Sequence, residues 1–389
     1  GPPGGFFAPW TTDMIPSAPE GSHIDDVITD ESIKWLESQV GAKEPFFLNL
    51  WYYSVHAPFE AKPELVEKYR TKAKSLPPDA PRANPVMAAM IETLDTNVGR
   101  ISDALDRLGV ADNTLLVFTS DNGGNEYNYV EGLLATNNHP LRNGKGNINE
   151  GGQRVPFIAV WPGKIAPGST NSGLVSSVDL FPTILDATQL SAAPGQPVDG
   201  ISLLPAFLEG SEIDPGRALF CHFPHSPPAT GTIGATSVRR GSWKLTRFYA
   251  DGAEQGDRLR LVDLNNDVGE SEDLSGAHAE RLEELNDLIT EHLTETGSLF
   301  SLPNPGYRPS SLGWNAAKDV RLSRIDDALV VEATGDDPSI ITKDFPRSTG
   351  KLSIEIEIEG VSPDDPPVLY WATRSANRFH RDRSQRLEE

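Results

Sequence analysis

Short polar segments of the sequence carry the side chains best suited to chemistry. Asp121 and Asn122 open an Asp-Asn-Gly-Gly turn that directly follows an apolar, β-branched run. A carboxylate and an amide oxygen held on a tight glycine turn are typical ligands of a hard cation such as Ca²⁺. Asp-Asn-Gly is also among the commonest turn sequences, so the segment alone predicts either a cation site or a simple turn.

Lys145 and His56 are the other two candidates. Lys145 lies in Asn-Gly-Lys-Gly-Asn, where flanking glycines let the backbone approach a ligand and leave the ammonium open to an oxyanion. His56 precedes Ala-Pro after an aromatic run, where its imidazole can donate to an oxyanion or protonate a leaving group. Taken singly, each residue has a simpler interpretation: Lys145 as an exposed loop lysine and His56 as a structural or exposed histidine.

Hydrophobic periodicity predicts the elements that must position these side chains. The helices and strands expected in the first half are 25–40, 46–53, 84–108, 114–120 and 154–161. Helices alternate with unbroken apolar strands, a pattern typical of a buried, mostly parallel sheet with helices on both faces. Ligands of such sheets gather beyond the carboxyl ends of the strands, where the histidine and the Asp-Asn turn both stand.

The remainder of the chain has a different pattern of predicted elements. We expect short antiparallel strands and an acidic amphipathic helix up to residue 300, and period-two strands at 328–333 and 352–359. The predicted division is an α/β core at 1–215, a smaller α+β subdomain at 216–300, a linker at 301–313 and a partial β-sandwich-like region at 314–389.

The charge balance restricts the partners. The net charge of −22 argues against a nucleic-acid surface and would repel an anionic substrate, so anion binding must rest on local cations and a metal. Arg239, Arg240 and Lys244 form one basic spot, although such spots are mostly solvated surface. No apolar run is long enough to span a bilayer, and the single cysteine, Cys221, excludes an intrachain disulfide.

Taken together and in order, the motifs resemble those of the sulfatase family over roughly residues 1–275. The stretches that carry the resemblance are PFFLNLWYYSVHAPFEAKPELVEKY, DTNVGRISDALDRLGVADNTLLVFTSDNGG, PLRNGKGNINEGGQRVPFIAVWPG, SSVDLFPTILDA, DGISLLPAF and VRRGSWKL. They are most similar to arylsulfatases and N-acetylgalactosamine-6-sulfatase-like enzymes. The resemblance implies an alkaline-phosphatase-like fold, hydrolysis of sulfated sugars or aryl sulfates, and export to the periplasm or beyond the cell.

The resemblance also implies roles for individual residues. The family's divalent-metal ligands fall on Asp121 and Asn122, which implies one Ca²⁺, and its sulfate-contacting lysine and histidine fall on Lys145 and His56. In the family these groups stabilise negative charge that develops on the sulfate and the departing oxygen. His225 stands where the family often has an aromatic-Pro-His sequence, so it is a candidate substrate contact, with a structural role as the alternative.

The chain departs from the family pattern in the nucleophile. Sulfatases form a formylglycine within Cys/Ser-x-Pro-x-Arg, which is absent here, and the sequences at Cys221 and Ser17 match it only in part. The early Asp-Asp metal pair is also missing, because Asp25 and Asp26 open a helix and are interpreted as capping it. We therefore expect that an N-terminal segment with the formylglycine has been lost and that these residues alone are inactive.

Two alternatives remain at this point. An inactive, sulfatase-like glycan-binding protein would keep the anion site without the nucleophile. A phosphatase or phosphodiesterase of the same superfamily would tend to carry Asp-His, with a nitrogen ligand for Zn²⁺, where this chain has Asp121 and Asn122.

Overall fold

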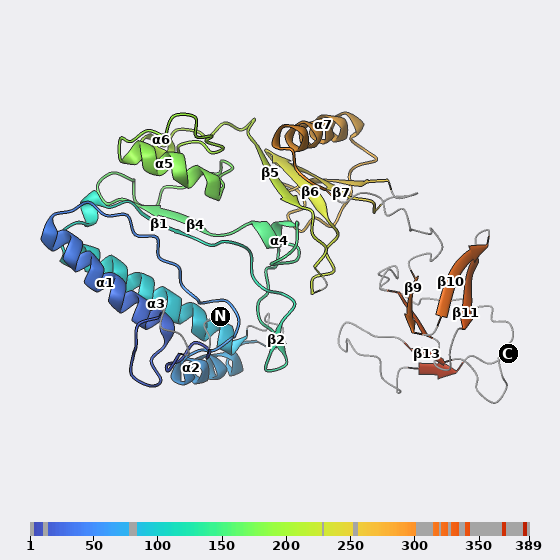
Figure 1. The fold of residues 1–389 in the computed structure, drawn as a ribbon, viewed down its shortest axis with the longest axis horizontal. Coiled ribbons are helices and arrows are strands. Elements are labelled where there is room, and N and C mark those ends of the chain that lie inside the picture. The colour runs from blue at the N-terminus through green and yellow to red at the C-terminus, as the bar shows by residue number, and fades with distance from the viewer. Residues whose placement is uncertain are drawn as a thin grey trace. The chain divides into compact units, whose positions relative to one another are not determined.

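The computed structural model divides the chain into two compact units, Gly1–Pro305 and Gly306–Glu389. The residues that it describes are 4–10, 15–77, 84–227, 229–251 and 256–300, together with short strands after residue 313. Figure 1 traces the elements of both units. All the predicted site residues belong to the first unit.

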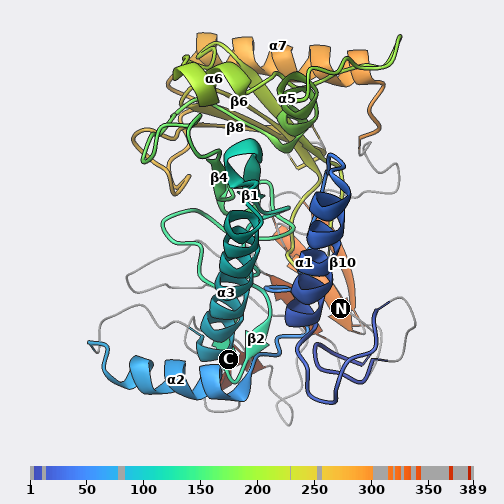
Figure 2. The ribbon, with the colours of Figure 1, turned by 90° about the vertical axis from the view of Figure 1, so that its left-hand side faces the viewer.

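Two long helices and a shorter one form the N-terminal layer of the first unit. α1 (Ile24–Ala42) and α3 (Pro85–Arg107) lie side by side, and α2 (Pro63–Lys74) lies across one end of the pair (Figure 2). α3 begins after Asn84, whose side chain accepts two backbone N–H bonds, and ends before Gly109, whose φ is 69°. Both long helices confirm the predictions from periodicity.

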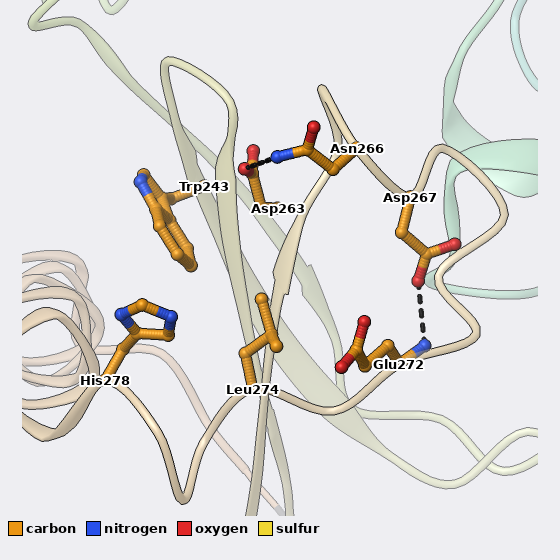
Figure 3. Close-up of a pocket in the computed structure, with 7 residues that line it drawn as sticks. All are labelled: Trp243, Asp263, Asn266, Asp267, Glu272, Leu274 and His278. Carbon is orange, nitrogen blue, oxygen red and sulfur yellow. Dashed lines mark hydrogen bonds between the residues drawn. The ribbon is translucent and has the colours of Figure 1, made fainter.

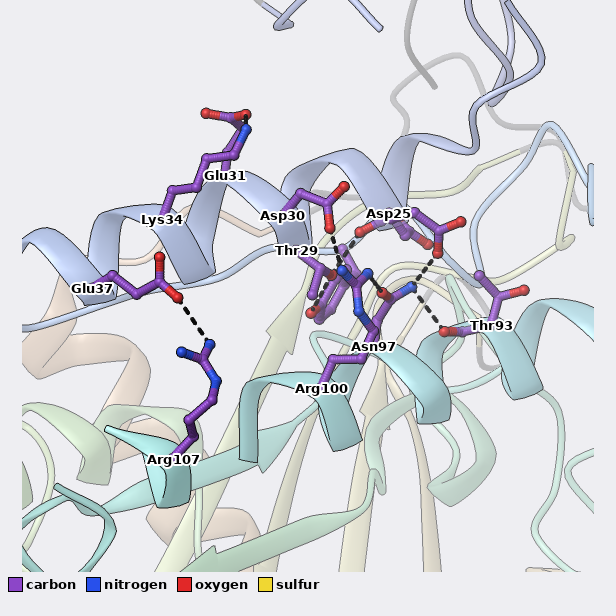
Figure 4. Close-up of polar contacts among 12 residues, drawn as sticks. Asp25, Thr29, Asp30, Glu31, Lys34, Glu37, Thr93, Asn97, Arg100 and Arg107 are labelled. Carbon is purple, nitrogen blue, oxygen red and sulfur yellow. Dashed lines mark hydrogen bonds and ion pairs between the residues drawn. The ribbon is translucent and has the colours of Figure 1, made fainter. Parts of the chain in front are cut away.

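Polar side chains join α1 to α3. Asn97 donates to the carboxylate of Asp26 at 2.9 Å, and Lys62 pairs with the same carboxylate at 2.7 Å. Arg100 pairs with Asp30 on the next turn of α1 (Figure 4). Burial alone would raise the pKa of Asp26, but the hydrogen bonds from Lys62 and Asn97 outweigh it and hold that pKa below its usual value. The ionised carboxylate therefore fixes the two helices in one relative position.

Asp25 ties α1 to the end of the segment that leads to His56. Its carboxylate is fully buried and accepts from the backbone amides of Tyr53 and Ser54 at 3.0 and 3.1 Å. The helix cap is instead His23, whose ring nitrogen accepts from the Asp25 amide. The expectation that the Asp25 carboxylate caps the helix is wrong, because it reaches across to another segment.

The predicted central sheet is observed as one pair of strands. β1 (Leu116–Thr119) and β4 (Phe157–Val160) pair antiparallel. The expected parallel pairing is not found among the described residues, where every strand pair is antiparallel. An unbroken apolar run predicts that a strand is buried, but it carries no information about the direction of the neighbouring strand.

Helices lie on both sides of this pair of strands. α5 (Leu180–Ala187) and α6 (Leu204–Glu209) lie on one side, and α1 and α3 lie on the other (Figure 1). On the first side, Phe157 of β4 contacts Phe207 of α6, with ring centroids 6.4 Å apart. The predicted mixed α/β class is therefore confirmed.

The segment 46–53 is extended but is not a strand. Among the described residues, no backbone hydrogen bond joins it to a neighbouring strand. Its side chains alternate between covered and exposed, with Phe47 and Trp51 67% and 78% exposed. The covered side chains pack on α1 and α3, and they are Phe46, Leu48 and Leu50. The predicted strand does not form because an extended chain becomes a strand only with a hydrogen-bonded partner.

The last part of the first unit is an antiparallel sheet covered by one helix. Its strands, paired in chain order, are β5 (Ala218–Phe223), β6 (Ala235–Arg240), β7 (Trp243–Phe248) and β8 (Arg258–Asp263). α7 (Ala279–Thr296) lies on one face of the sheet (Figure 1). The core between them contains Val238, Leu245, Leu261, Leu285, Ile289 and Leu293. These elements confirm the predicted strands and acidic helix.

The shorter elements of the first unit are η1 (Ala111–Asn113), β2 (Tyr129–Val130), β3 (Leu133–Leu134), α4 (Glu150–Gln153) and η2 (Ser177–Asp179). No helix of the described residues is long and apolar enough to cross a membrane.

The second unit is described through its strand pairs. They are β9 (Trp314–Lys318) with β12 (Ser339–Thr342), β10 (Val320–Ile325) with β11 (Ala328–Ala333), and β13 (Val368–Tyr370) with β14 (Ser384–Arg386). The strand predicted at 328–333 is confirmed. The strand predicted at 352–359 lies outside the described residues.

Replacing Asp25 by alanine should destabilise the first unit. The backbone amides of Tyr53 and Ser54 would lose a buried, charged acceptor, which we expect to lower the free energy of unfolding by about 3 kcal/mol. Asp30→Ala is the matched control on the same helix, because its pair with Arg100 is exposed and worth less than about 1 kcal/mol. Urea unfolding of both variants measures the difference, and equal losses would contradict the role of Asp25.

Candidate functional site

The residues 121–124, here called the Asp121 turn, follow β1 after one intervening residue, Ser120. Asp121 is exposed and Asn122 is partly buried. The side-chain nitrogen of Asn122 donates to the Gly123 carbonyl at 2.9 Å, so its amide oxygen and the Asp121 carboxylate are the atoms left for a cation. Oxygen donors of this kind suit Ca²⁺ better than Zn²⁺.

These two side chains supply part of a cation site. Ca²⁺ takes about six to eight oxygen ligands. The described residues contain no group of three or more His, Cys, Asp or Glu side chains that could hold a metal ion. Asp121 and Asn122 therefore fit calcium in the type of donor but not in the number of donors.

The Asp121 turn is interlocked with residues 143–152, here called the Lys145 loop. The backbone amide of Lys145 donates to the Gly124 carbonyl at 2.9 Å, and that of Gly123 donates to the Gly152 carbonyl at 3.0 Å. A Cβ atom on Gly123 would lie 1.7 Å from the Gly151 carbonyl oxygen. Only glycine allows this approach. The predicted cation ligands and the predicted anion-binding lysine therefore lie on two segments in direct contact, the Asp121 turn and the Lys145 loop, which are together called the platform.

Asn138 strengthens the interlock and was missed by the sequence analysis. Its side chain accepts from the Gly124 amide at 3.2 Å and donates to the carbonyls of Gly124 and Asn143 at 3.0 and 3.1 Å. It thereby bridges the Asp121 turn and the Lys145 loop. The sequence holds no signal for this role, because the neighbouring Asn137 is chemically identical.

The positive charge of the Lys145 ammonium is not neutralised by an ion pair with the described residues. Lys145 is partly exposed and forms no ion pair within the described part of the chain. The nearby cations Arg239 and Lys244 both pair with Glu150 and are thereby neutralised. Lys145 is therefore the cation of this platform that can attract an oxyanion.

His56 is exposed on the loop that follows the extended segment. Its Nδ1 lies 2.7 Å from the Ala57 carbonyl oxygen. No hydrogen bond or ion pair among the described residues joins His56 to the Asp121 turn or the Lys145 loop. The predicted grouping of His56 with Lys145 therefore stays a prediction.

The segment that carries His225 reaches the Lys145 loop. Thr230 and Thr232 both donate to the Gly146 carbonyl, at 3.1 and 2.8 Å. His225 itself is exposed, and its ring contacts the Phe223 ring edge-on at 5.3 Å. These contacts place Thr230 and Thr232 beside the Lys145 loop, and the role of His225 as a substrate contact stays a prediction.

Cys221 and His222 lie on β5 and have structural surroundings. Burial raises the pKa of the Cys221 thiol, which keeps it in the unreactive protonated form. The two ring nitrogens of His222 lie 2.7 Å from the Thr236 hydroxyl and 2.8 Å from the Leu299 carbonyl. Both observations fit a structural role for Cys221 and His222.

A separate pocket of about 350 Å³ lies on the antiparallel sheet (Figure 3). It is lined by Trp243, Asp263, Asn266, Asp267, Glu272, Leu274 and His278. Two of its carboxylates form hydrogen bonds with nearby residues: Asp263 accepts from the Asn266 side chain at 2.7 Å, and Asp267 accepts from the Glu272 backbone amide at 2.7 Å. None of the predicted site residues lines this pocket.

Replacing Gly123 by alanine should disrupt the platform. The added methyl group would collide with the Gly151 carbonyl, which we expect to destabilise the first unit by about 2 to 3 kcal/mol. Gly99→Ala is the control, because a Cβ atom there meets nothing within 4 Å and alanine favours the helix by about 0.5 to 1 kcal/mol. Urea unfolding measures both, and a Gly123→Ala protein as stable as the parent would contradict the close contact.

Comparison with family models identifies most of the first unit. Residues 6–190 match the model described as Sulfatase, and residues 144–298 match the model described as N-sulphoglucosamine sulphohydrolase, C-terminal. The first range includes Asp121, Asn122, Lys145 and His56. The second range includes the antiparallel sheet and α7.

Individual proteins agree with the family models. A sulfatase of Formosa agariphila is 33% identical over 282 residues, which cover 68% of this chain and 47% of that protein. N-acetylgalactosamine-6-sulfatase of Mus musculus is 32% identical over 227 residues, which cover 57% of this chain and 39% of that enzyme. The chain thus spans half or less of the length of these relatives.

A solved structure confirms the fold. The crystal structure of Ps i-CgsB in complex with k-i-k-neocarrahexaose superposes with a TM-score of 0.60 and 27% sequence identity. The match covers 71% of this chain and 56% of that protein.

Proposed function

Because residues 6–298 belong to the sulfatase family, we propose that they supply the sulfate-binding part of a sulfuric-ester hydrolase that acts on sulfated carbohydrates or aryl sulfates. The observation that carries the proposal is the interlock of the Asp121 turn with the Lys145 loop. It holds oxygen donors for a cation and an unpaired ammonium on one platform. Export to the periplasm or beyond the cell belongs to the same proposal.

In this proposal Lys145 binds the sulfate oxygens. Its ammonium lies in a protein of net charge −22, so the overall field opposes an anion and the local charge must offset that repulsion. As the ester bond breaks, negative charge grows on the oxygens that the ammonium faces, and the attraction strengthens. His56 donates a hydrogen bond to the sulfate or a proton to the departing oxygen.

We also propose that Asp121 and Asn122 contribute two oxygen ligands to a Ca²⁺ ion. When bound, the ion would offset the charge of the sulfate and polarise its oxygens. Further ligands must come from other residues, because two side chains do not fill a calcium shell.

Binding without turnover is the second candidate function for these residues. The 389 residues contain no Cys/Ser-x-Pro-x-Arg motif from which formylglycine forms. The thiol of Cys221 has a raised pKa and lies on a strand of the antiparallel sheet, so it is not a substitute nucleophile. Hydrolysis therefore needs a nucleophile from outside these residues, and the chain by itself is proposed to bind sulfated glycans.

Replacing Lys145 by alanine should weaken binding of N-acetylgalactosamine 6-sulfate. Loss of one charge-assisted contact to an oxyanion costs about 1.5 to 3 kcal/mol, or roughly 10- to 100-fold in Kd. Isothermal titration calorimetry measures this, with unsulfated N-acetylgalactosamine as the reference ligand.

Lys164→Ala is the matched control for this experiment. Lys164 lies over the Trp161 ring at 3.7 Å and takes no part in the platform, so its loss should leave the affinity unchanged. Equal affinities of the parent and Lys145→Ala proteins would contradict the role of Lys145. Release of sulfate by the chain alone would contradict binding without turnover.

The metal distinguishes the sulfatase proposal from a phosphatase or phosphodiesterase. We expect the protein to bind Ca²⁺ and Asp121→Asn to lower the affinity, because a neutral amide replaces a charged ligand. Elemental analysis of the purified protein and calcium titration measure this. Stoichiometric Zn²⁺ would favour the phosphatase alternative.

A further inference from the structure

A buried ionic cluster stands behind the Lys145 loop. Lys244 of β7 is 1% exposed, and its ammonium donates to the Ile148 carbonyl and to Glu150, each at 3.0 Å. The same ammonium pairs with Glu270 at 3.1 Å. All three N–H groups of Lys244 are therefore matched by acceptors, two of which belong to the Lys145 loop.

Arg239 and a backbone amide complete the cluster. Arg239 of β6 pairs with the second carboxylate oxygen of Glu150 at 2.9 Å. The second carboxylate oxygen of Glu270 accepts from the backbone amide of Glu150 at 2.7 Å. Two cations and two carboxylates thus cancel in charge. Of the expected basic spot, Lys244 and Arg239 belong to this network, whereas Arg240 forms a half-exposed pair with Glu284.

The cluster contacts the part of the loop that touches the Asp121 turn. Glu150 directly precedes Gly151, whose carbonyl oxygen lies against Gly123. Arg142, just before the loop, donates to the Glu270 carbonyl at 2.6 Å. The cluster therefore ties both ends of the loop to the antiparallel sheet.

We infer that Lys244, Glu150 and Glu270 form a positioning network that holds the Lys145 loop and the Asp121 turn in the geometry for binding a sulfate ester. This inference rests on the function proposed for Lys145. None of the three side chains touches the substrate in this account, because all three are buried.

Directional bonds explain why the network is ionic rather than apolar. Apolar residues of similar volume often give equal or greater stability than a buried ion pair, but they do not fix the position of a backbone in the same way. Here the ammonium of Lys244 selects one carbonyl and two carboxylates. Without it, two buried carboxylates would face each other with Arg239 as their remaining cation, and the segment of Glu150 would move toward water.

Hydrogen exchange of the full chain tests the position of the loop. Lys244→Met and the milder Glu270→Gln should accelerate exchange at residues 142–152 by about tenfold or more, while β6 and β7 stay protected. Arg240→Met is the control, because it breaks a half-exposed pair with Glu284 in the same sheet. Lys145→Ala should leave the exchange of the loop unchanged.

Titration of the same variants with N-acetylgalactosamine 6-sulfate tests the consequence. Lys244→Met and Glu270→Gln should weaken binding by about tenfold although Lys145 is intact. Unchanged exchange of the loop in both folded variants would overturn the inference, and so would faster exchange with unchanged affinity. If the parent protein binds no sulfated sugar, the proposed function fails, and the exchange data alone decide whether the network holds the loop.

Discussion

The close approach of two backbone segments is the constraint on which the candidate site depends. A Cβ atom on Gly123 would collide with the Gly151 carbonyl, and one on Gly151 would collide with the Asn143 carbonyl, so glycine at both positions lets the Asp121 turn and the Lys145 loop pack together. A side chain at position 123 would force the two segments apart and lengthen the backbone hydrogen bonds between them. The glycines of both segments are therefore needed for the contact between the segments, and not only for the approach of a ligand.

Charge pairing inside the molecule decides which cation can act on an anion. Arg239 and Lys244 are neutralised by Glu150 and Glu270, and Arg217 is neutralised by Asp179. Lys145 is partly exposed and forms no ion pair within the described residues, although the protein carries a net charge of −22. This pairing is what separates Lys145 from neighbouring basic residues that look equally suitable in the sequence.

Local patterns predicted the elements well where the element is held by its own residues. The helices α1, α3 and α7 follow from the spacing of their apolar residues, because a helix forms its hydrogen bonds within one segment. The segment 46–53 shows the limit: its aromatic-rich apolar run predicts a strand, but a strand forms only when a second segment pairs with it. The sequence did not predict that β4 runs antiparallel to β1 for the same reason: strand pairing depends on residues distant in the chain.

The sequence by itself determined the family, the residue types of the site and the turns that carry Asp121, Asn122 and Lys145, because the motifs and their glycines are local. Only the tertiary structure decided which cations near the candidate site pair with carboxylates, and that Lys145 forms no ion pair with the described residues. Lys244 and Glu150 are 94 residues apart, and no local pattern distinguishes a buried lysine that meets a carboxylate from one that faces water. Long-range contacts of this kind form only when the sheet and the loop pack together.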